Sequence, residues 1–268
     1  MDWNEQINQI KVNRKYRHLE LLDETILDVL RQAEKEGGSQ KIIIQKARKK
    51  IHNIVAAYLG DIDYTQAKKN LIDAFQTTDD KQKKQVCREI LSQHDTTKER
   101  LVYYQAFFEF IITICGYPRT VLDLACGLNP FALPFSGFPN TTRYYAYDIH
   151  KPRVDLINHF FSLCGMQSLA ECRDVLVRPP KIRADAAFLF QEAHRMEKRR
   201  SGSSSELIYA INAKFIFISL PARSLRTRHD LQMTMRRLMQ EIISDKFMLI
   251  NERVFDNEIL FCLVRKSG

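Results

Sequence analysis

Three short segments of the sequence carry residues suited to hold a nucleoside. Gly127 and Asp148 each follow an apolar run, and Asp174 precedes Val175 in a third segment. A glycine lets the backbone approach a ligand closely, and an acid ~20 residues further on is where doubly wound folds bind a ribose. The acid of the third segment can bind the amino group of an adenine, and the apolar residue after it can cover the face of the adenine ring. These positions predict a nucleoside site at the carboxyl ends of adjacent strands.

The glycine turn does not match a phosphate-binding loop. Residues 121–130 contain one glycine, whereas a dinucleotide-binding turn has three in the pattern G-x-G-x-x-G. The ligand indicated therefore carries a nucleoside but lacks phosphates. Taken singly, the glycine fits an ordinary strand-to-helix turn and either acid fits a helix cap. Their order along the chain resembles that of S-adenosylmethionine-dependent methyltransferases of the Rossmann-like class.

The segments that must position these residues alternate between strand and helix patterns. After Pro118, short apolar and β-branched runs are separated by helical stretches, which favours βαβ units and a mostly parallel sheet. Two final runs flank Asp256-Asn257 and predict a hairpin. The predicted strands are residues 120–124, 143–147, 186–190, 214–220, 248–255 and 258–264, with a short one before Asp174. We predict an α/β fold, a Rossmann-like class I methyltransferase sheet with a C-terminal antiparallel hairpin.

The first 115 residues have a helical pattern instead. Apolar residues recur every three or four positions, as on one face of an amphipathic helix. The three rows are Leu19, Leu22, Ile26 and Leu30; Ile43, Ala47, Ile51, Ile54 and Tyr58; and Val102, Ala106, Phe110 and Ile114. Breaks are expected at 37–39 and 60–61. We predict an all-α RNA-docking domain over 1–115 and a methyltransferase domain over 116–268, with a flexible basic loop at 195–206.

The composition is that of a globular protein with a polyanionic partner. The 268 residues are 45% hydrophobic and 27% charged, which excludes a disordered or fibrous chain, and the net charge of +9 suits nucleic acid or an anionic membrane. No apolar run reaches the ~18 residues of a spanning helix, and residues 1–10 lack the apolar core of a secretory signal. The six cysteines form no C-x-x-C pair and the histidines no H-E-x-x-H pattern. We expect free thiols, no metal site and a cytoplasmic location.

Several islands of the sequence are similar to one family. They include His-Asp-Thr-Thr-Lys-Glu-Arg-Leu at 94–101 and Ala-Cys-Gly-Leu-Asn-Pro-Phe-Ala-Leu at 125–133. Further islands lie at 13–19, 47–52 with 57–58, 146–150 and 219–225. Together they resemble the aminoglycoside-resistance 16S ribosomal RNA methyltransferases of the Arm and Rmt type, over most of residues 11–265.

The resemblance implies a reaction, a cofactor and a set of site residues. The reaction is methylation of N7 of guanine 1405, in the decoding site of the small ribosomal subunit, and the cofactor is S-adenosylmethionine. Arg100 would meet the methionine carboxylate bidentately, as guanidinium geometry allows. Arg223 and Ser224 are the candidates for contact with the target base. The residues implied in cofactor binding are Tyr58, His94, Thr96, Arg100, Ala125, Gly127, Asp148, Ile149, Asp174, Val175 and Phe190.

Clusters of positive charge predict contacts with RNA. Residues 11–17 and 46–50 each carry four basic side chains, and such clusters bind phosphates without reading the base sequence. A solvated helix face is the alternative interpretation. A second basic set, which includes Arg195, Lys198, Arg199 and Arg200, is expected on loops of the catalytic half. The predicted RNA-binding residues are Lys15, Arg17, Arg48, Lys50, Arg226 and Arg228, and the predicted partner is 16S ribosomal RNA within the small subunit, with no membrane.

Two segments depart from the family pattern, and both fall where the target base should dock. Phe190 is followed by Gln-Glu-Ala-His-Arg where the family has a lysine and an apolar run, and residues 226–233 replace a Gly-Met-Glu motif and a tyrosine. The alternatives are therefore a methyltransferase of the same fold acting on another RNA position or a small molecule, and an RNA-binding protein with a degenerate cofactor site.

Overall fold

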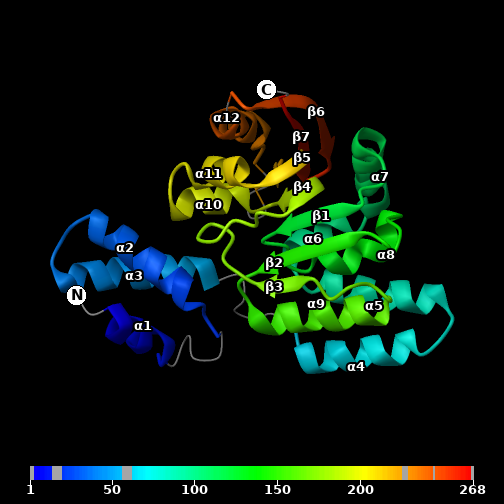
Figure 1. The fold of residues 1–268 in the computed structure, drawn as a ribbon, viewed down its shortest axis with the longest axis horizontal. Coiled ribbons are helices and arrows are strands. Elements are labelled where there is room, and N and C mark those ends of the chain that lie inside the picture. The colour runs from blue at the N-terminus through cyan, green and yellow to red at the C-terminus, as the bar shows by residue number, and fades with distance from the viewer. Residues whose placement is uncertain (1–2, 14–19, 56–61, 225–228, 244, 267–268) are drawn as a thin grey trace.

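A seven-stranded sheet forms the centre of the molecule. The computed structural model describes residues 3–13, 20–55, 62–224, 229–243 and 245–266 (Figure 1). Within these ranges the strand order is β3-β2-β1-β4-β5-β7-β6. The bounds are β1 Thr120–Leu124, β2 Arg143–Asp148, β3 Ala170–Cys172, β4 Arg183–Phe190, β5 Asn212–Pro221, β6 Phe247–Phe255 and β7 Glu258–Arg265. The first five strands are parallel, and β7 runs antiparallel to both β5 and β6. The predicted Rossmann-like sheet with its terminal hairpin is confirmed.

Helices cover both faces of this sheet. One face packs against α4 Tyr64–Phe75, α5 Asp80–Ser92, α7 Tyr104–Cys115 and α9 Lys151–Leu163, and the other against α10 Ala193–Arg199, α11 Ser203–Ala210 and α12 Gln232–Ile242. Shorter elements are α6 Asp95–Arg100, η2 Asn129–Ala132 and α8 Leu133–Ser136. Strand β1 is buried along its whole length because it lies between these two layers.

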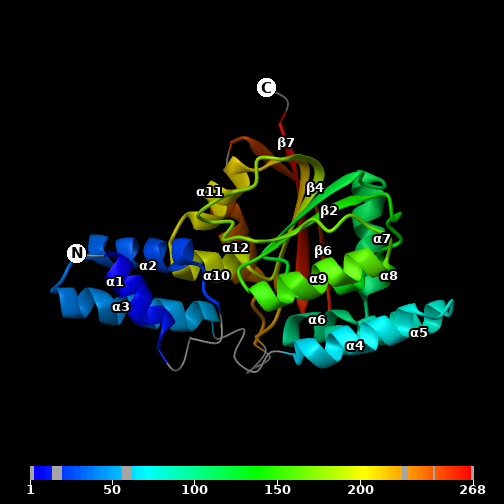
Figure 2. The same cartoon turned by 60° about the horizontal axis from the view of Figure 1, so that its bottom comes forward.

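The first three helices form a separate apolar cluster. They are α1 Trp3–Lys11, α2 Asp23–Lys35 and α3 Gln40–Val55. Their buried residues, such as Ile26, Leu30 and Ile51, contact one another rather than the sheet, and Figure 2 shows these helices to one side of it. Ile62 and the buried residues of α4, α5 and α7 belong instead to the apolar cluster that these helices form with α9 and the sheet. The expected break at 37–39 lies between α2 and α3. The division of the chain into domains at residue 115 stays a prediction.

Two local predictions are wrong. Residues 195–206 form no flexible loop, because α10 and α11 fill most of this stretch. The predicted apolar row of α7 is not its buried face: Val102 precedes the helix and is 90% exposed, whereas Phe107 and Ile111 are fully buried. Helix α7 is apolar on almost every side, so the spacing alone could not select the face that packs. Leu19, Tyr58 and residues 60–61 lie outside the described part of the chain.

Candidate functional site

Asp148 lies at the carboxyl end of β2 and is 3% exposed. Its Oδ1 accepts a hydrogen bond from the His150 backbone N–H at 2.9 Å. Its Oδ2 accepts from the Gly127 N–H at 3.1 Å and from Nη1 of Arg153 at 3.2 Å. Gly127 takes a left-handed conformation (φ +54°) that a side chain would strain. The structure thus brings the predicted glycine turn and the predicted ribose acid into direct contact.

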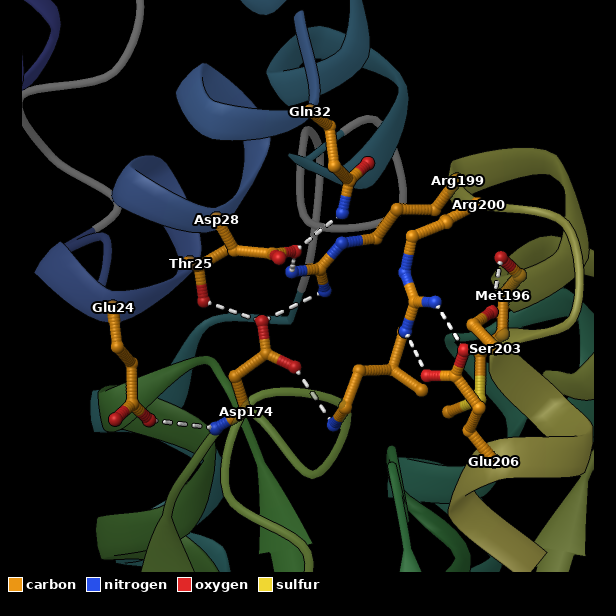
Figure 3. Close-up of polar contacts among 11 residues, drawn as sticks. Glu24, Thr25, Asp28, Gln32, Asp174, Met196, Arg199, Arg200, Ser203 and Glu206 are labelled. Carbon is orange, nitrogen blue, oxygen red and sulfur yellow. Dashed lines mark hydrogen bonds and ion pairs between the residues drawn. The ribbon is translucent and has the colours of Figure 1, made fainter. Parts of the chain in front are cut away.

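Asp174 follows β3 and is 2% exposed. It lies beside Asp148, because the N–H of Arg173 donates to the Asp148 carbonyl at 2.9 Å. Its Oδ1 accepts from the Leu176 N–H at 3.0 Å, and its Oδ2 accepts from Thr25 Oγ1 at 2.8 Å and Arg199 Nη1 at 2.7 Å (Figure 3). The two acids therefore share one edge of the sheet, as the spacing of the motifs predicts.

Counting their contacts with the described residues, both carboxylates keep an unused acceptor position. An ionised carboxylate offers about four acceptor positions, and Asp148 and Asp174 each use three of them within the chain. One position on Oδ1 of each acid can accept a ribose hydroxyl or an adenine amino group. A second ribose bond to Asp148 would need the position that Arg153 holds. The Arg153 guanidinium faces the turn, since a Cβ built at Gly127 would lie 3.9 Å from its Nη1. The acceptor set fits an adenosyl group once Arg153 gives way.

Arg100, at the end of α6, is buried in an ion pair. Its Nε and Nη2 donate to the two carboxylate oxygens of Glu258 at 2.8 and 2.6 Å, and its Nη1 donates to Asn129 Oδ1 at 3.3 Å. Burial opposes the charge, but the Glu258 carboxylate raises the pKa of Arg100 above its ordinary value. This bidentate edge of Arg100 is thus paired with Glu258, so a bidentate contact with a methionine carboxylate would use another edge and stays a prediction.

Of the other predicted cofactor residues, Phe190 lies against Arg100. Its guanidinium lies 5.1 Å from the ring centre of Phe190 and 4.9 Å from that of Phe107. At the start of the same motif, His94 Nδ1 and Thr96 Oγ1 are 3.0 Å apart. Ala125, Ile149 and Val175 flank the residues at the strand ends, and of these only Val175 is fully buried. Tyr58 lies outside the described residues.

A buried polar chain continues from Arg100 into the sheet. Asn129 accepts from Arg100 and donates through Nδ2 to Asp123 Oδ2 at 2.9 Å. Tyr144 donates to the same oxygen at 2.7 Å. Burial raises the pKa of Asp123 to about 7, although both donors favour its charged form. The interior of β1 therefore contains an acid that changes charge near neutral pH.

The segments expected to meet the target base lie at the ends of β4 and β5. Gln191 has a positive φ of +61°, and its N–H donates to the carbonyl and hydroxyl of Ser219. Burial raises the pKa of Glu192 to about 7, while the nearby Arg195 opposes the shift. Arg223 is exposed, and the Ser224 N–H donates to the His229 carbonyl at 2.9 Å. Arg226 and Arg228 fall outside the described residues.

The predicted RNA-binding residues differ in their surroundings. Arg48 is exposed on α3, whereas Lys50 pairs with Glu36 at 2.5 Å. Lys15 and Arg17 lie outside the described part of the chain. Arg199 and Arg200, expected on a basic loop, lie at the end of α10, where Arg199 pairs with Asp28 and Asp174 and Arg200 pairs with Glu206. Arg195 and Lys198 are exposed on α10.

Sequence reasoning missed four residues that hold the site together. Arg153 was recognisable in principle, because it lies in the first turn of α9, five positions after the acid with which it pairs. Glu258 had a weaker signal, an acid at the first position of an apolar strand. Thr25 and Arg199 gave none, since their partner Asp174 is 149 and 25 positions away.

A parallel sheet that carries a glycine turn and two acids at neighbouring strand ends is a doubly wound nucleoside-binding fold. The antiparallel β7 between β5 and β6 gives it the strand order of the class I methyltransferases. Among known families, the model described as "Ribosomal RNA methyltransferase (FmrO)" matches residues 13–254. The chain belongs to this family.

Relatives and solved structures agree with that assignment. The 16S rRNA (guanine(1405)-N(7))-methyltransferase of Serratia marcescens is 28% identical over all of both chains. The enzyme of the same name from Micromonospora rosea is 29% identical over 69% of this chain and 68% of its own. The structure of the 16S rRNA methylase RmtB superposes with a TM-score of 0.78 at 26% identity, over 99% of both chains. RmtF, solved with S-adenosylhomocysteine, has the same fold, with a TM-score of 0.79 at 23% identity over 99% of this chain and 100% of its own.

Neither a membrane-spanning helix nor a metal-binding group occurs among the described residues. No helix in these ranges is both long and apolar enough to cross a bilayer. No group of three or more His, Cys, Asp or Glu side chains there is arranged to hold a metal ion. All six cysteines, which lie within the described part, are free thiols.

Proposed function

We propose that this protein transfers the methyl group of S-adenosylmethionine to N7 of guanine 1405 in 16S ribosomal RNA. The observation that carries the proposal is the similarity to the Serratia marcescens enzyme of that name along the whole of both chains. The substrate would be the RNA within the small subunit, in the cytoplasm. The methyl group would place bulk and positive charge in the aminoglycoside site and so confer resistance.

The acids at the strand ends would hold the cofactor. Asp148 would accept a ribose hydroxyl and Asp174 the adenine amino group, while Val175 covers the ring. The Gly127 turn would let the ligand approach the backbone, and Arg100 with His94 and Thr96 would face the methionine end. Ala125, Ile149, Phe190 and Tyr58 complete the proposed pocket. When bound, the cofactor supplies an electrophilic methyl group on its sulfonium.

The chemistry requires positioning rather than proton transfer. N7 of guanine already carries a lone pair in the plane of the ring, so no side chain must first remove a proton. The chain needs to align this lone pair with the methyl group and to exclude water, and such positioning can supply ~7–11 kcal/mol. Arg223, Ser224 and the strained Gln191 lie on the segments suited to orient the base.

The N-terminal helices would dock on the RNA. The net charge of +9 favours a polyanion, and Arg48 is exposed on α3, where it can reach a phosphate. We assign docking to residues 1–115 and methyl transfer to residues 116–268. Lys15, Arg17, Lys50, Arg226 and Arg228 would add further phosphate contacts.

The direct test is methyl transfer from labelled S-adenosylmethionine to purified small subunits, followed by borohydride and aniline cleavage of the RNA at N7-methylguanine and primer extension to the break. We expect label in the RNA and a modification at guanine 1405. A stop at another nucleotide would favour the alternative RNA target, to which the departures after Phe190 point. Folded protein that binds S-adenosylhomocysteine but transfers no label to the subunits would reject the proposal. Expression should also raise the aminoglycoside concentration that cells tolerate.

A further inference from the structure

Arg199 joins two acids from distant parts of the chain. Its Nη1 donates to Asp174 Oδ2 at 2.7 Å, and its Nη2 donates to Asp28 Oδ2 at 2.5 Å (Figure 3). The Arg199 side chain is 9% exposed, so the bridge is largely shielded from water. Shielding strengthens charged contacts and makes the loss of one partner costly.

Helix α2 also forms direct hydrogen bonds with Asp174. Thr25 Oγ1 donates to Asp174 Oδ2 at 2.8 Å, and the Asp174 N–H donates to Glu24 Oε1 at 3.1 Å. Glu24 also accepts from Arg178 Nε at 2.7 Å, further along the same loop. The first turns of α2 are thus fastened to the loop that follows β3.

Hydrogen bonds also hold the segment of chain that carries Arg199. The Met196 carbonyl accepts from the Arg200 N–H at 2.9 Å and from Ser203 Oγ at 2.8 Å. The Arg200 guanidinium pairs through both terminal nitrogens with Glu206. These bonds fix the corner between α10 and α11, and so fix the backbone from which Arg199 extends.

These contacts leave one oxygen of Asp174 turned away from α2. Oδ2 receives Thr25 and Arg199, whereas Oδ1 receives only the Leu176 N–H. A ligand amino group can therefore bind Oδ1 while α2 stays attached. The orientation of this carboxylate depends on where α2 lies. Of its three donors, Thr25 belongs to α2, and Arg199 is paired with Asp28 of α2.

We propose that Arg199 is a positioning residue for Asp174, and that Thr25, Asp28, Asp174 and Arg199 form a latch that couples RNA docking by α1–α3 to cofactor binding. The inference rests on the proposed function. RNA bound to α1–α3 holds α2 in place, which keeps the carboxylate oriented for the adenine. By reciprocity, bound cofactor strengthens docking by the same factor.

The test compares the affinity for S-adenosylhomocysteine with and without small ribosomal subunits. For the wild type we expect tighter binding with subunits, by at least about fivefold, within the usual range of coupling between sites. The variant Thr25→Val with Asp28→Asn keeps the shape of α2 and the Arg199–Asp174 pair, but it loses the Thr25 hydroxyl that donates to Asp174 and the Asp28 charge that accepts from Arg199. Its affinity should change less than about twofold on adding subunits. Glu34→Gln, exposed on the same helix, should behave as the wild type.

Arg199→Lys gives a second measurement, because lysine keeps the charge but lacks the two separate guanidinium nitrogens that reach Asp174 and Asp28. It should weaken S-adenosylhomocysteine binding by about tenfold without subunits, with a melting temperature close to that of Glu34→Gln. An unchanged coupling factor in the Thr25 and Asp28 double variant, or none in the wild type, would overturn the latch. If methylation then proceeds normally, only the latch fails; if no subunit RNA is methylated, the proposed function fails with it.

Discussion

The two acids of the site end neighbouring strands, yet different parts of the molecule hold them. The donors to Asp148 come from the adjoining turn and from the start of α9, all within the sheet unit. Asp174 takes donors from α2 and α10, which lie far from it in the sequence. Both acids are almost completely buried.

This difference separates a self-contained half of the site from a shared half. Among the described residues, the half around Asp148 and Arg100 depends on contacts inside the sheet unit, so we expect it to keep its geometry wherever α1–α3 lie. The half around Asp174 takes its geometry from how the helical cluster sits on the sheet. Variants that affect one half and spare the other can therefore test the comparison.

The largest effect is expected at Asp148. Asp148→Ala removes the ribose acceptor and leaves Arg153 without its buried carboxylate, so detectable S-adenosylhomocysteine binding should be lost in calorimetry. Asp174→Ala should weaken binding by only ~10–100-fold, the value of one charge-assisted hydrogen bond. Asp155→Ala, which removes an exposed acid on α9, is the control. Near-normal affinity in Asp148→Ala would show that the ribose site lies elsewhere.

Breaking the ion pair in the self-contained half should cost stability. Glu258→Gln leaves the buried Arg100 charge without its counter-ion, and urea unfolding should show a loss of about 3–5 kcal/mol. In the shared half, Asp28→Asn should lower the free energy of unfolding by less than Glu258→Gln does, because Arg199 still pairs with Asp174. The matched control is Glu252→Gln, whose partner Arg236 is partly exposed, with an expected loss of at most ~1 kcal/mol. Equal losses in all three would contradict the comparison.

Charge reversal on α3 should affect RNA and spare the cofactor. Arg48→Glu with Lys50→Glu should weaken binding to small subunits by about tenfold and reduce its salt dependence by roughly one counter-ion per lost phosphate contact. Affinity for S-adenosylhomocysteine without subunits should not change. Lys81→Glu with Lys84→Glu, on the exposed side of α5, serves as the control pair. An enzyme with a small-molecule substrate would keep full activity in both pairs.

A further effect is a pH dependence in the self-contained half. Burial raises the folded-state pKa of Asp123 from 3.8 to about 7, so the folded protein binds a proton that the unfolded chain has released. Stability from this group is complete below pH ~4 and is lost as the pH rises through about 7, by at most ~1.4 kcal/mol per pH unit. Denaturant unfolding of Asp123→Asn should lack this slope. A wild type whose stability rose over that interval, after correction with the variant, would disprove the assignment.

The sequence predicted the self-contained half better than the shared half. Apolar runs located the strands to within a few residues, and parallel strands bring their carboxyl ends together, so Gly127 and Asp148 could be paired from their spacing. Arg199 could not be placed, because a basic stretch followed by Ser-Gly-Ser-Ser-Ser is typical of a loop. In the structure Ser203 and Ser204 are fully buried, and their hydroxyls are satisfied because they donate to carbonyls of α10. Local sequence therefore cannot show that these serine hydroxyls are buried, because their acceptors lie on another helix.

The pair of Arg100 and Glu258 also bears on how the protein folds. The two residues are 158 positions apart, so their contact closes a very long loop, and such contacts slow folding because chain entropy must be lost first. The pair can form only once β7 has joined β5. During refolding, the ability to bind S-adenosylhomocysteine should therefore emerge with the final kinetic phase, after most helical signal has returned.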